Sequence, residues 1–310
     1  MPTQTTGLAN LSPEMQTYYD KKLLARLLPN WVHGQFGQKR PIPKMGGKTI
    51  NFRQFTGLTA ATTPLTEGVT PAGNSLNVTQ KTATVAQYGD YIEISDVLDL
   101  TAIDPVLDET AELLGEQASE TLDVIVRDIL VAGTTVQYAN GRASRVTVAA
   151  GDNLTVAEIR KAVRTLKKNK VKPLEGGDYV MICGPSAIYD LQSDTKWEQA
   201  SQYAGSKQIF SGEIGRLYGV RFIETPLAKV FAGAGAAAID VHASIILGKD
   251  AYGIVDVAGS GAVQNIIKPH GSAGTADPLN QRGTSGWKAL FTAVRLEELA
   301  ILRIEHAVSG

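Results

Sequence analysis

The stretch DPVLDETAELLGEQASETLDVIVRDILVAG, residues 104–133, decides the fold. Apolar residues recur in it at steps of 4, 3, 4, 4, 3 and 4, the period of an α-helix with one buried face. They are Leu107, Ala111, Leu114, Ala118, Leu122, Ile125 and Ile129. Asp104 as N-cap, Pro105 at the first helical position and Gly133 after the last turn set its predicted ends. Such a helix is about 40 Å long, longer than most helices of globular proteins.

The composition limits the classes of function. The 310 residues suffice for one large domain or two intimate ones, and 43% hydrophobic content supports a real core. The net charge is −1, whereas proteins that work by binding nucleic-acid backbones usually have a basic excess. A single cysteine, Cys183, excludes an internal disulfide and a cysteine metal cluster. The first residues lack a secretory signal pattern and no apolar run reaches about 18 residues, so we expect synthesis in a reducing cytosol and no membrane partner.

Residues 41–95 differ from the rest of the chain. Pro41 and Pro43 lead into a β-like run, Lys48–Phe55, and the polar excursion TGLTAATTPLTEGVTPAGNS follows at residues 56–75. Residues 77–95 then read as strand again. A loop of about 20 residues is unusual inside a compact domain, and an isolated two-stranded arm is marginal in water. We therefore infer that this arm lies on something outside its own domain; the alternative is a flexible surface hairpin.

The remaining elements alternate between helix and strand. At the N-terminus, a flexible arm over residues 1–11 precedes a helix that Ser12-Pro13-Glu14 begins and Pro29 ends. The pattern predicts a strand pair over 134–150 that turns at Asn140-Gly141, and helices over 155–170, after 184 and over 195–210. Predicted strands are 179–183, 219–223, 243–247, 254–257, 287–296 and 299–306, with a polar loop at 271–286. Glu297-Glu298 is poor turn chemistry, which favours one long, bent strand over 287–306.

The helix predicted over 155–170 carries an unusual row of cations. Its start, Thr155-Val156-Ala157-Glu158, is a capping-box pattern. The cations are Arg160, Lys161, Arg164, Lys167, Lys168 and Lys170. One reading is a surface for DNA or a partner. The favoured reading is a solvated face with cations near a helix C-terminus, where the helix dipole stabilises them.

No motif in the sequence assembles a catalytic or cofactor site. Gly47-Lys48-Thr49 looks like the end of a phosphate-binding loop, but the first glycine of that motif would be residue 42, which is Ile42, and no helix follows. The histidines are scattered, without metal-ligand spacing. We expect no enzyme activity, no cofactor and no metal.

Gly212, Gly215 and Gly219 form a loose glycine fingerprint in SGEIGRLYGV. A dinucleotide site needs the glycines between a strand and a helix, whereas these precede a strand. We therefore predict that they serve turns and close packing.

Several strings resemble the major capsid (coat) proteins of tailed bacteriophages, in the branch typified by the podovirus N-four. They are Pro43-Lys44 through Gly47-Lys48-Thr49-Ile50, LTEGVTP at 65–71, QYGDYIEISD at 87–96, SGEIGRLYGVRFIET at 211–225 and IIKPHGSAGTADPLNQRGTSGWK at 266–288. The resemblance runs nearly from end to end of the chain.

The resemblance implies the Johnson fold, the α+β shell fold of tailed phages and herpesviruses. Its parts would be an N-terminal arm (1–40), an extended loop (41–95), a peripheral domain with the long spine helix (96–175 and 269–310) and an axial domain (176–268). The extended loop would lie across a neighbouring subunit. The residues expected to serve this contact are Lys48, Phe52, Phe55, Leu65, Glu67, Val78 and Tyr88.

The implied function is structural. Such proteins self-assemble as pentamers and hexamers into an icosahedral shell around packaged double-stranded DNA, which they contact nonspecifically. The expected partners are a scaffolding protein, a portal and, as a further candidate, a decoration protein, with assembly in the bacterial host cytoplasm and a final place in the virion. Gly115 would either let the spine helix bend as the shell expands or permit close packing. The alternatives are an encapsulin-like nanocompartment that loads a cargo enzyme, and a soluble enzyme.

Overall fold

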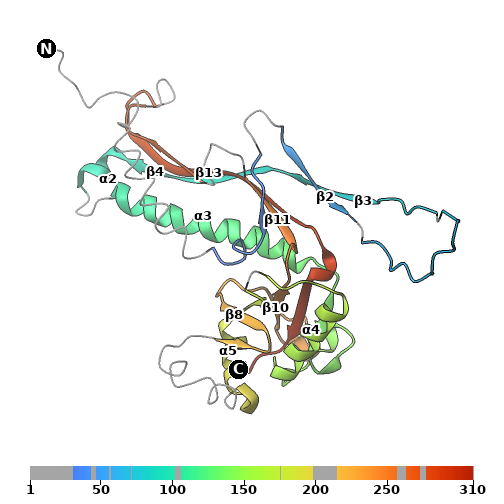
Figure 1. Ribbon diagram of the computed structural model, residues 1–310. Coiled ribbons are helices and arrows are strands. Elements are labelled where there is room, and N and C mark those ends of the chain that lie inside the picture. Colours follow the sequence, from blue (N-terminus) through green and yellow to red (C-terminus); the bar gives the residue numbers. More distant parts are fainter. Residues whose placement is uncertain are drawn as a thin grey trace.

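The structure is a computed structural model that describes residues 31–42, 47–55, 57–70, 72–101, 106–174, 176–197, 215–256, 263–272 and 277–309. These residues form two modules and a hairpin that projects from them (Figure 1). The predicted helix after Ser12 and most of the predicted helix over 195–210 lie outside the described residues.

The first module, here the α3 module, is a five-stranded sheet with α3 (Val106–Val131) along one face (Figure 1). Its central strand is β13 (Arg282–Arg295), which pairs antiparallel with β4 (Ala86–Ser95) at one edge. At its other edge it pairs with β12 (Gln264–Lys268) and then with β11 (Tyr252–Asp256), and β1 (Gln38–Lys39) runs parallel to β11. A short helix, α2 (Asp96–Thr101), follows β4.

The helical stripe read from the sequence is the buried face of α3. Ala111, Leu114, Ala118 and Leu122 are buried as predicted, whereas toward the C-terminus Val126 and Leu130 are the buried residues. The predicted Ile125 and Ile129 are only half-buried against the same core. Opposite them, every second residue of β13 from Trp287 to Ala293 is buried, which is the period of a strand with one covered face. The helix prediction is confirmed; Asp104 and Pro105, its predicted start, lie outside the described residues.

The second module, here the α4 module, is a seven-stranded sheet in the order β5-β14-β10-β6-β8-β7, with β9 also paired to β10. Its strands are β5 (Val136–Tyr138), β6 (Tyr179–Cys183), β7 (Arg216–Leu217), β8 (Val220–Glu224), β9 (Val230–Phe231), β10 (Val241–Leu247) and β14 (Ile301–His306). Its helices are α4 (Val156–Lys168) and α5 (Pro185–Gln192), with short 3-10 turns η1 (Ala139–Gly141), η2 (Arg145–Thr147), η3 (Ala236–Ala238) and η5 (Glu298–Ala300). Thr155 caps α4 as predicted, because its side chain accepts a hydrogen bond from the Glu158 amide.

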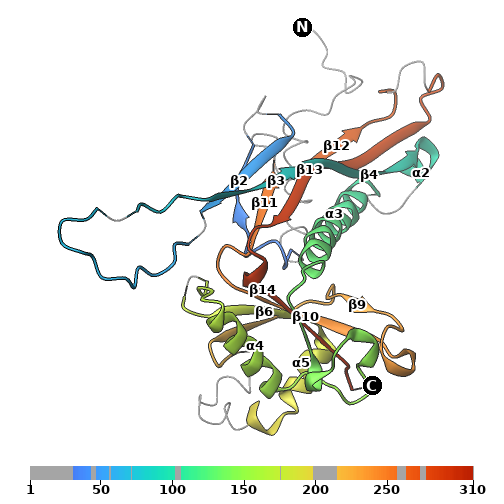
Figure 2. The ribbon, with the colours of Figure 1, turned by 90° about the vertical axis from the view of Figure 1, so that its right-hand side faces the viewer.

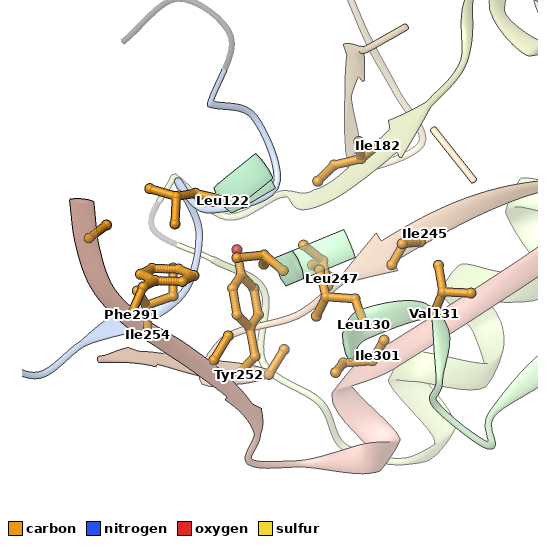
Figure 3. Packing of buried hydrophobic residues seen from close by; sticks show 14 of the residues in the cluster. Leu122, Leu130, Val131, Ile182, Ile245, Leu247, Tyr252, Ile254, Phe291 and Ile301 are labelled. Atoms are coloured by element: carbon orange, nitrogen blue, oxygen red, sulfur yellow. The ribbon is translucent and has the colours of Figure 1, made fainter. Parts of the chain in front are cut away.

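The two modules share one hydrophobic core at the C-terminal end of α3. Leu122 and Leu130 of α3 lie beside Tyr252, Ile254 and Phe291 of its own sheet (Figure 3). The same cluster includes Ile182, Ile245, Leu247 and Ile301 of the α4 module (Figure 3). The end of the spine helix therefore joins the two sheets.

The segment Trp287–His306 is two strands in two sheets, so the prediction of one bent strand is wrong. β13 belongs to the α3 module and β14 to the α4 module, with η5 between them. The amides of Leu296 and Glu297 both donate to the Ala251 carbonyl, which ends β13 and turns the chain toward the other sheet.

Two further predictions of local structure are wrong: the second strand of the pair over 134–150 is absent, and part of the predicted loop at 271–286 is a strand. Over 134–150, Asn140 and Gly141 have the positive φ of a tight turn, but no return strand pairs with β5, which instead pairs parallel with β14. The segment after the turn is held by ion pairs, Arg142–Asp152 and Arg145–Glu305, in place of a β-ladder. The loop predicted at 271–286 is strand from Arg282 onward, because those residues complete the ladder with β4.

The sheets do not follow the predicted domain boundaries. The prediction assigns α4 and β14 to the peripheral domain, yet Leu166, Leu302 and Ile304 share an apolar cluster with Met181 and Ile246 of the predicted axial domain. Conversely, β11 and β12 belong to the sheet of β13. The cause is the change of sheet between β13 and β14. The terms peripheral and axial describe places in an assembled shell, and that use of them stays a proposal.

A buried polar pair fixes residues 31–37 to the middle of α3. Asp123 accepts hydrogen bonds from the His33 ring at 2.6 Å, from the His33 amide at 2.7 Å and from the Val32 amide at 3.0 Å. Both side chains are at most 1% exposed. The Tyr252 hydroxyl adds a bond to the His33 carbonyl. A buried carboxylate with three donors is stabilising only while all of them remain in place.

We predict that Asp123→Ala lowers the free energy of unfolding of the subunit by about 3–5 kcal/mol, because it leaves buried donors unpaired. The matched control is Glu120→Ala on the exposed face of α3, which should change it by less than about 0.5 kcal/mol. Denaturant unfolding of the unassembled subunit measures both. An Asp123→Ala variant as stable as the control would contradict the structural role of the pair.

Candidate intersubunit arm

The hairpin consists of β2 (Thr49–Phe55), β3 (Val78–Thr84) and the arm loop, residues 57–70 and 72–77. The two strands pair in register from Thr49 opposite Thr84 to Phe55 opposite Val78. Both views show it projecting away from the two modules (Figures 1 and 2). Its backbone is paired along both strands, but only its base is packed against the body of its own subunit.

Phe52 anchors the base of the hairpin within its own chain. It is 3% exposed and packs with Ile42, Ala83 and Val255. Gly253 in β11 gives it room, since a Cβ at that position would lie only 2.6 Å from the ring. Phe52 is therefore not available to a neighbouring subunit, which corrects the expectation that it belongs to the intersubunit surface.

The arm loop exposes its large apolar residues. Leu65 is 78% exposed, and Leu58, Val69 and Leu76 are similarly bare. Around Gly57, Gly68 and Gly73 no heavy atom would lie within 4 Å of an added Cβ, so the loop runs through open space. Sequence reasoning singled out Leu65 but missed the other three, although apolar residues inside a polar excursion are the signal that would have found them.

Residues 66–69 of the arm loop form a tight turn that displays Glu67. The Val69 amide donates to the Thr66 carbonyl at 3.2 Å, and Gly68 has φ +77°. A positive φ at the third residue is the geometry of a type II turn and favours glycine. The turn therefore holds one acidic side chain between two exposed apolar ones, Leu65 and Val69.

The other predicted arm residues divide between the hairpin and the body. Lys48, Phe55 and Val78 are exposed on the hairpin, Phe55 by 61%. Tyr88 lies instead in β4, paired with Ala289, and packs against the main core. The extended loop therefore ends near residue 85, ten residues before the predicted boundary, because residues 86–95 are needed as the edge strand of the α3 module.

The glycines lie in turns or in the spine helix. Gly219 has φ +77° and forms with Tyr218 the two-residue turn between β7 and β8, and Gly215 has φ +65°. Gly212 lies outside the described residues. Gly115 is buried, and α3 runs across it without interruption.

The side chains that could act as nucleophiles, Ser244 and Cys183, are buried and do not form an open site. His306 and Ser244 are hydrogen bonded at 2.9 Å, but both are buried, and burial lowers the pKa of His306 to about 4, so the ring stays neutral. Burial raises the pKa of the Cys183 thiol. Within the described ranges, no cluster of three or more potential metal ligands occurs. The same residues include no helix that is both long and apolar enough to cross a membrane.

The sequence profile of the phage capsid protein family matches residues 78–304, most of the chain. This protein belongs to the phage capsid protein family. No curated protein matches the chain.

Solved capsids share the fold of this capsid protein. The capsid subunit of cyanophage Pam1 superposes with a TM-score of 0.72 at 16% identity, covering 100% of this chain and 97% of that one. The capsid of Ralstonia phage GP4 gives 0.69 at 12% identity, covering 100% and 96%. The α+β capsid-shell fold of tailed phages, the Johnson fold, is therefore confirmed, and family membership indicates a structural role. The assignment to the N-four branch stays a prediction.

A virus-like particle from Pyrococcus furiosus is also similar, with a TM-score of 0.55 at 11% identity, covering 94% of this chain and 99% of that one. The family match makes a nanocompartment less supported than a phage capsid.

Phe52 and Phe55 lie three residues apart, on opposite faces of β2, and this gives a paired prediction. Phe52→Ala should open the base of the hairpin, at a local cost of about 3 kcal/mol, because it empties a buried site. Faster amide hydrogen exchange in β2 and β3 reports this opening. Phe55→Ala should leave exchange unchanged and weaken assembly. Equal effects of the two substitutions on exchange would refute the distinction between anchor and contact residue.

Proposed function

We propose that this capsid protein assembles as pentamers and hexamers into an icosahedral shell around packaged double-stranded DNA, and that each subunit reaches a neighbour through the arm loop. The observation that carries the intersubunit role is the row of exposed apolar side chains on the arm loop, from Leu58 to Leu76. An isolated two-stranded arm gains little by exposing such residues to water, whereas it gains stability when a partner covers them.

The geometry divides the hairpin into an anchor and a contact segment. The anchor is the Phe52 cluster, which fixes the direction of the two strands relative to β11. The contact segment is the arm loop, whose residues lack neighbours in their own subunit around each of its three described glycines. A fixed base with an open tip lets one subunit present the same surface to each neighbour around a ring, as a heterologous interface requires.

Other partners rest on the resemblance to tailed-phage coat proteins. It supports a separate scaffolding protein, a portal and nonspecific contact with DNA, with assembly in the cytoplasm of the bacterial host. A decoration protein is a further candidate.

Replacing residues 58–75 by a short glycine-serine turn should leave a folded subunit that does not form closed shells, because these residues do not contribute to the core. Circular dichroism tests the fold, and electron microscopy of assembly reactions that contain the scaffolding protein tests the shells. Normal shells from this deletion would exclude the arm loop as an intersubunit contact.

A milder pair of variants provides the control for this deletion. Leu65→Ser with Val69→Ser should impair assembly, whereas Val146→Ser with Tyr189→Ser, equally exposed residues on the α4 module, should not.

DNA extracted from wild-type particles distinguishes a genome-filled capsid from a nanocompartment that holds a protein cargo.

We further propose that Gly115 lets α3 bend when the first-formed shell expands. Gly115→Ala raises helix propensity by up to about 1 kcal/mol and should slow or block expansion while making the subunit as stable as before or up to about 1 kcal/mol more stable. If the glycine instead serves close packing, the added methyl group destabilises the subunit by about 1–3 kcal/mol. Glu120→Ala controls for propensity alone. Time-resolved small-angle scattering of shells measures expansion, and an unchanged rate in the Gly115 variant contradicts the bend.

A further inference from the structure

The exposed face of α4 concentrates unpaired positive charge. Arg160, Arg164, Lys167 and Lys168 are exposed and line, with Tyr218, a hollow of about 540 Å³. In the described part of the chain, these four cations form no ion pair with a carboxylate, whereas Lys161 on the same helix pairs with Glu158 at 2.7 Å. The Arg160 guanidinium lies 5.2 Å from the centre of the Tyr218 ring.

The helix dipole does not account for this arrangement. It favours cations only in the last turn, which contains Lys167 and Lys168. Arg160 lies near the positive N-terminal end of α4, and Arg160, Arg164 and Lys168 are spaced four residues apart, where like charges destabilise a helix. The helix dipole therefore explains the positions of Lys167 and Lys168, but not those of Arg160 and Arg164.

The residues that follow the C-terminus of α4 line a second basic hollow. Its volume is about 730 Å³, and its exposed cations are Arg40, Arg53, Lys81, Lys170, Lys172 and Lys249. The Lys249 amide donates to the Lys172 carbonyl at 2.9 Å, so the backbones of these two lysines are adjacent. Asp250 and Glu297 are the carboxylates among its lining residues, and Glu297 accepts a hydrogen bond from Gln54.

Consecutive residues line the two hollows, Lys167 and Lys168 the first and Asn169 and Lys170 the second, and the two together are here called the basic band. Both views place α4 and the base of the hairpin on the same side of the molecule (Figures 1 and 2). The band holds four cations from the first hollow and six from the second, ten of the chain's 30 lysines and arginines, although the net charge of the whole chain is −1. Within the described residues, none of the ten has an ion pair.

We propose that the basic band binds the phosphate backbone of double-stranded DNA without sequence preference. The length of the band favours a continuous polyanion: Arg160 to Lys168 alone spans about 12 Å of helix axis, and the second hollow extends it. Duplex DNA presents a charge about every 1.7 Å along its axis. The arm loop of a second copy offers a single carboxylate, Glu67, which is too little charge to match the band. This inference rests on the proposed enclosure of DNA by the shell.

The test compares two triple substitutions that remove equal charge. The band variant is Arg160→Gln, Arg164→Gln and Lys168→Gln, in which glutamine preserves helix propensity. The control variant is Lys48→Gln, Lys196→Gln and Lys268→Gln, three exposed cations that line neither hollow. Fluorescence anisotropy of a labelled mixed-sequence duplex with the unassembled full-length subunit, over a series of salt concentrations, measures binding. Circular dichroism verifies that both variants are folded.

The slope of log K against log salt should fall by about 3 in the band variant, one phosphate contact for each cation removed, and by clearly less in the control. Equal losses in both variants, or no loss in either, overturn the proposal. Binding of polyglutamate in preference to the duplex by the wild-type subunit also overturns it, in favour of an acidic protein segment. Electron microscopy of wild-type assembly reports separately on the shell, so a failure to form shells would count against the proposed function and not against the duplex measurement.

Discussion

The burial of one face of α3 against β13 is the constraint on which the rest of the structure depends. The helix has an apolar stripe along its length, and only a strand as long as β13 offers enough alternating apolar residues to cover it. The C-terminal end of α3 lies in a core that includes residues of both modules, so the same helix also fixes how the two sheets meet. Asp123, midway along the helix, attaches residues 32 and 33 to this frame through three short hydrogen bonds.

The hairpin differs from these packed modules, because its loop lies in open space around Gly57, Gly68 and Gly73. Its base is packed by Phe52 and its loop is not packed at all, although the loop carries four large apolar side chains. A monomeric protein has little use for such a structure, since exposed apolar groups on an unsupported arm are a liability. A capsid subunit can use it as a contact, with the frame holding its direction and the neighbour supplying its cover. The basic band lies at the root of the same arm, so the surfaces proposed for a neighbour and for DNA are adjacent.

The spacing and type of neighbouring residues were enough to predict the elements that depend only on such local patterns. The stripe of α3, the cap of α4 and the buried strand β6 follow directly from spacing and residue type. The failures arise from long-range pairing. Arg282–Gly286 have the composition of a loop, but they form a strand because they pair with β4. Phe52 has the residue type of a contact residue, but it is buried because Gly253 leaves space for its ring. The His33–Asp123 pair joins residues 90 positions apart, and two isolated polar residues carry no pattern that could reveal it. For the arm, the sequence located the hairpin, its role as an intersubunit contact stays a proposal, and the division into a packed base and an exposed loop required the packing.

The most direct test of the central claim is a single-particle reconstruction of the assembled shell at a resolution that traces the backbone of the arm loop. The account predicts that residues 57–77 lie on a neighbouring subunit, with Leu65 and Val69 covered by it and Phe52 still packed against β11 of its own chain. An arm loop that folds back onto its own subunit, or that stays uncovered in every subunit of the shell, would contradict it.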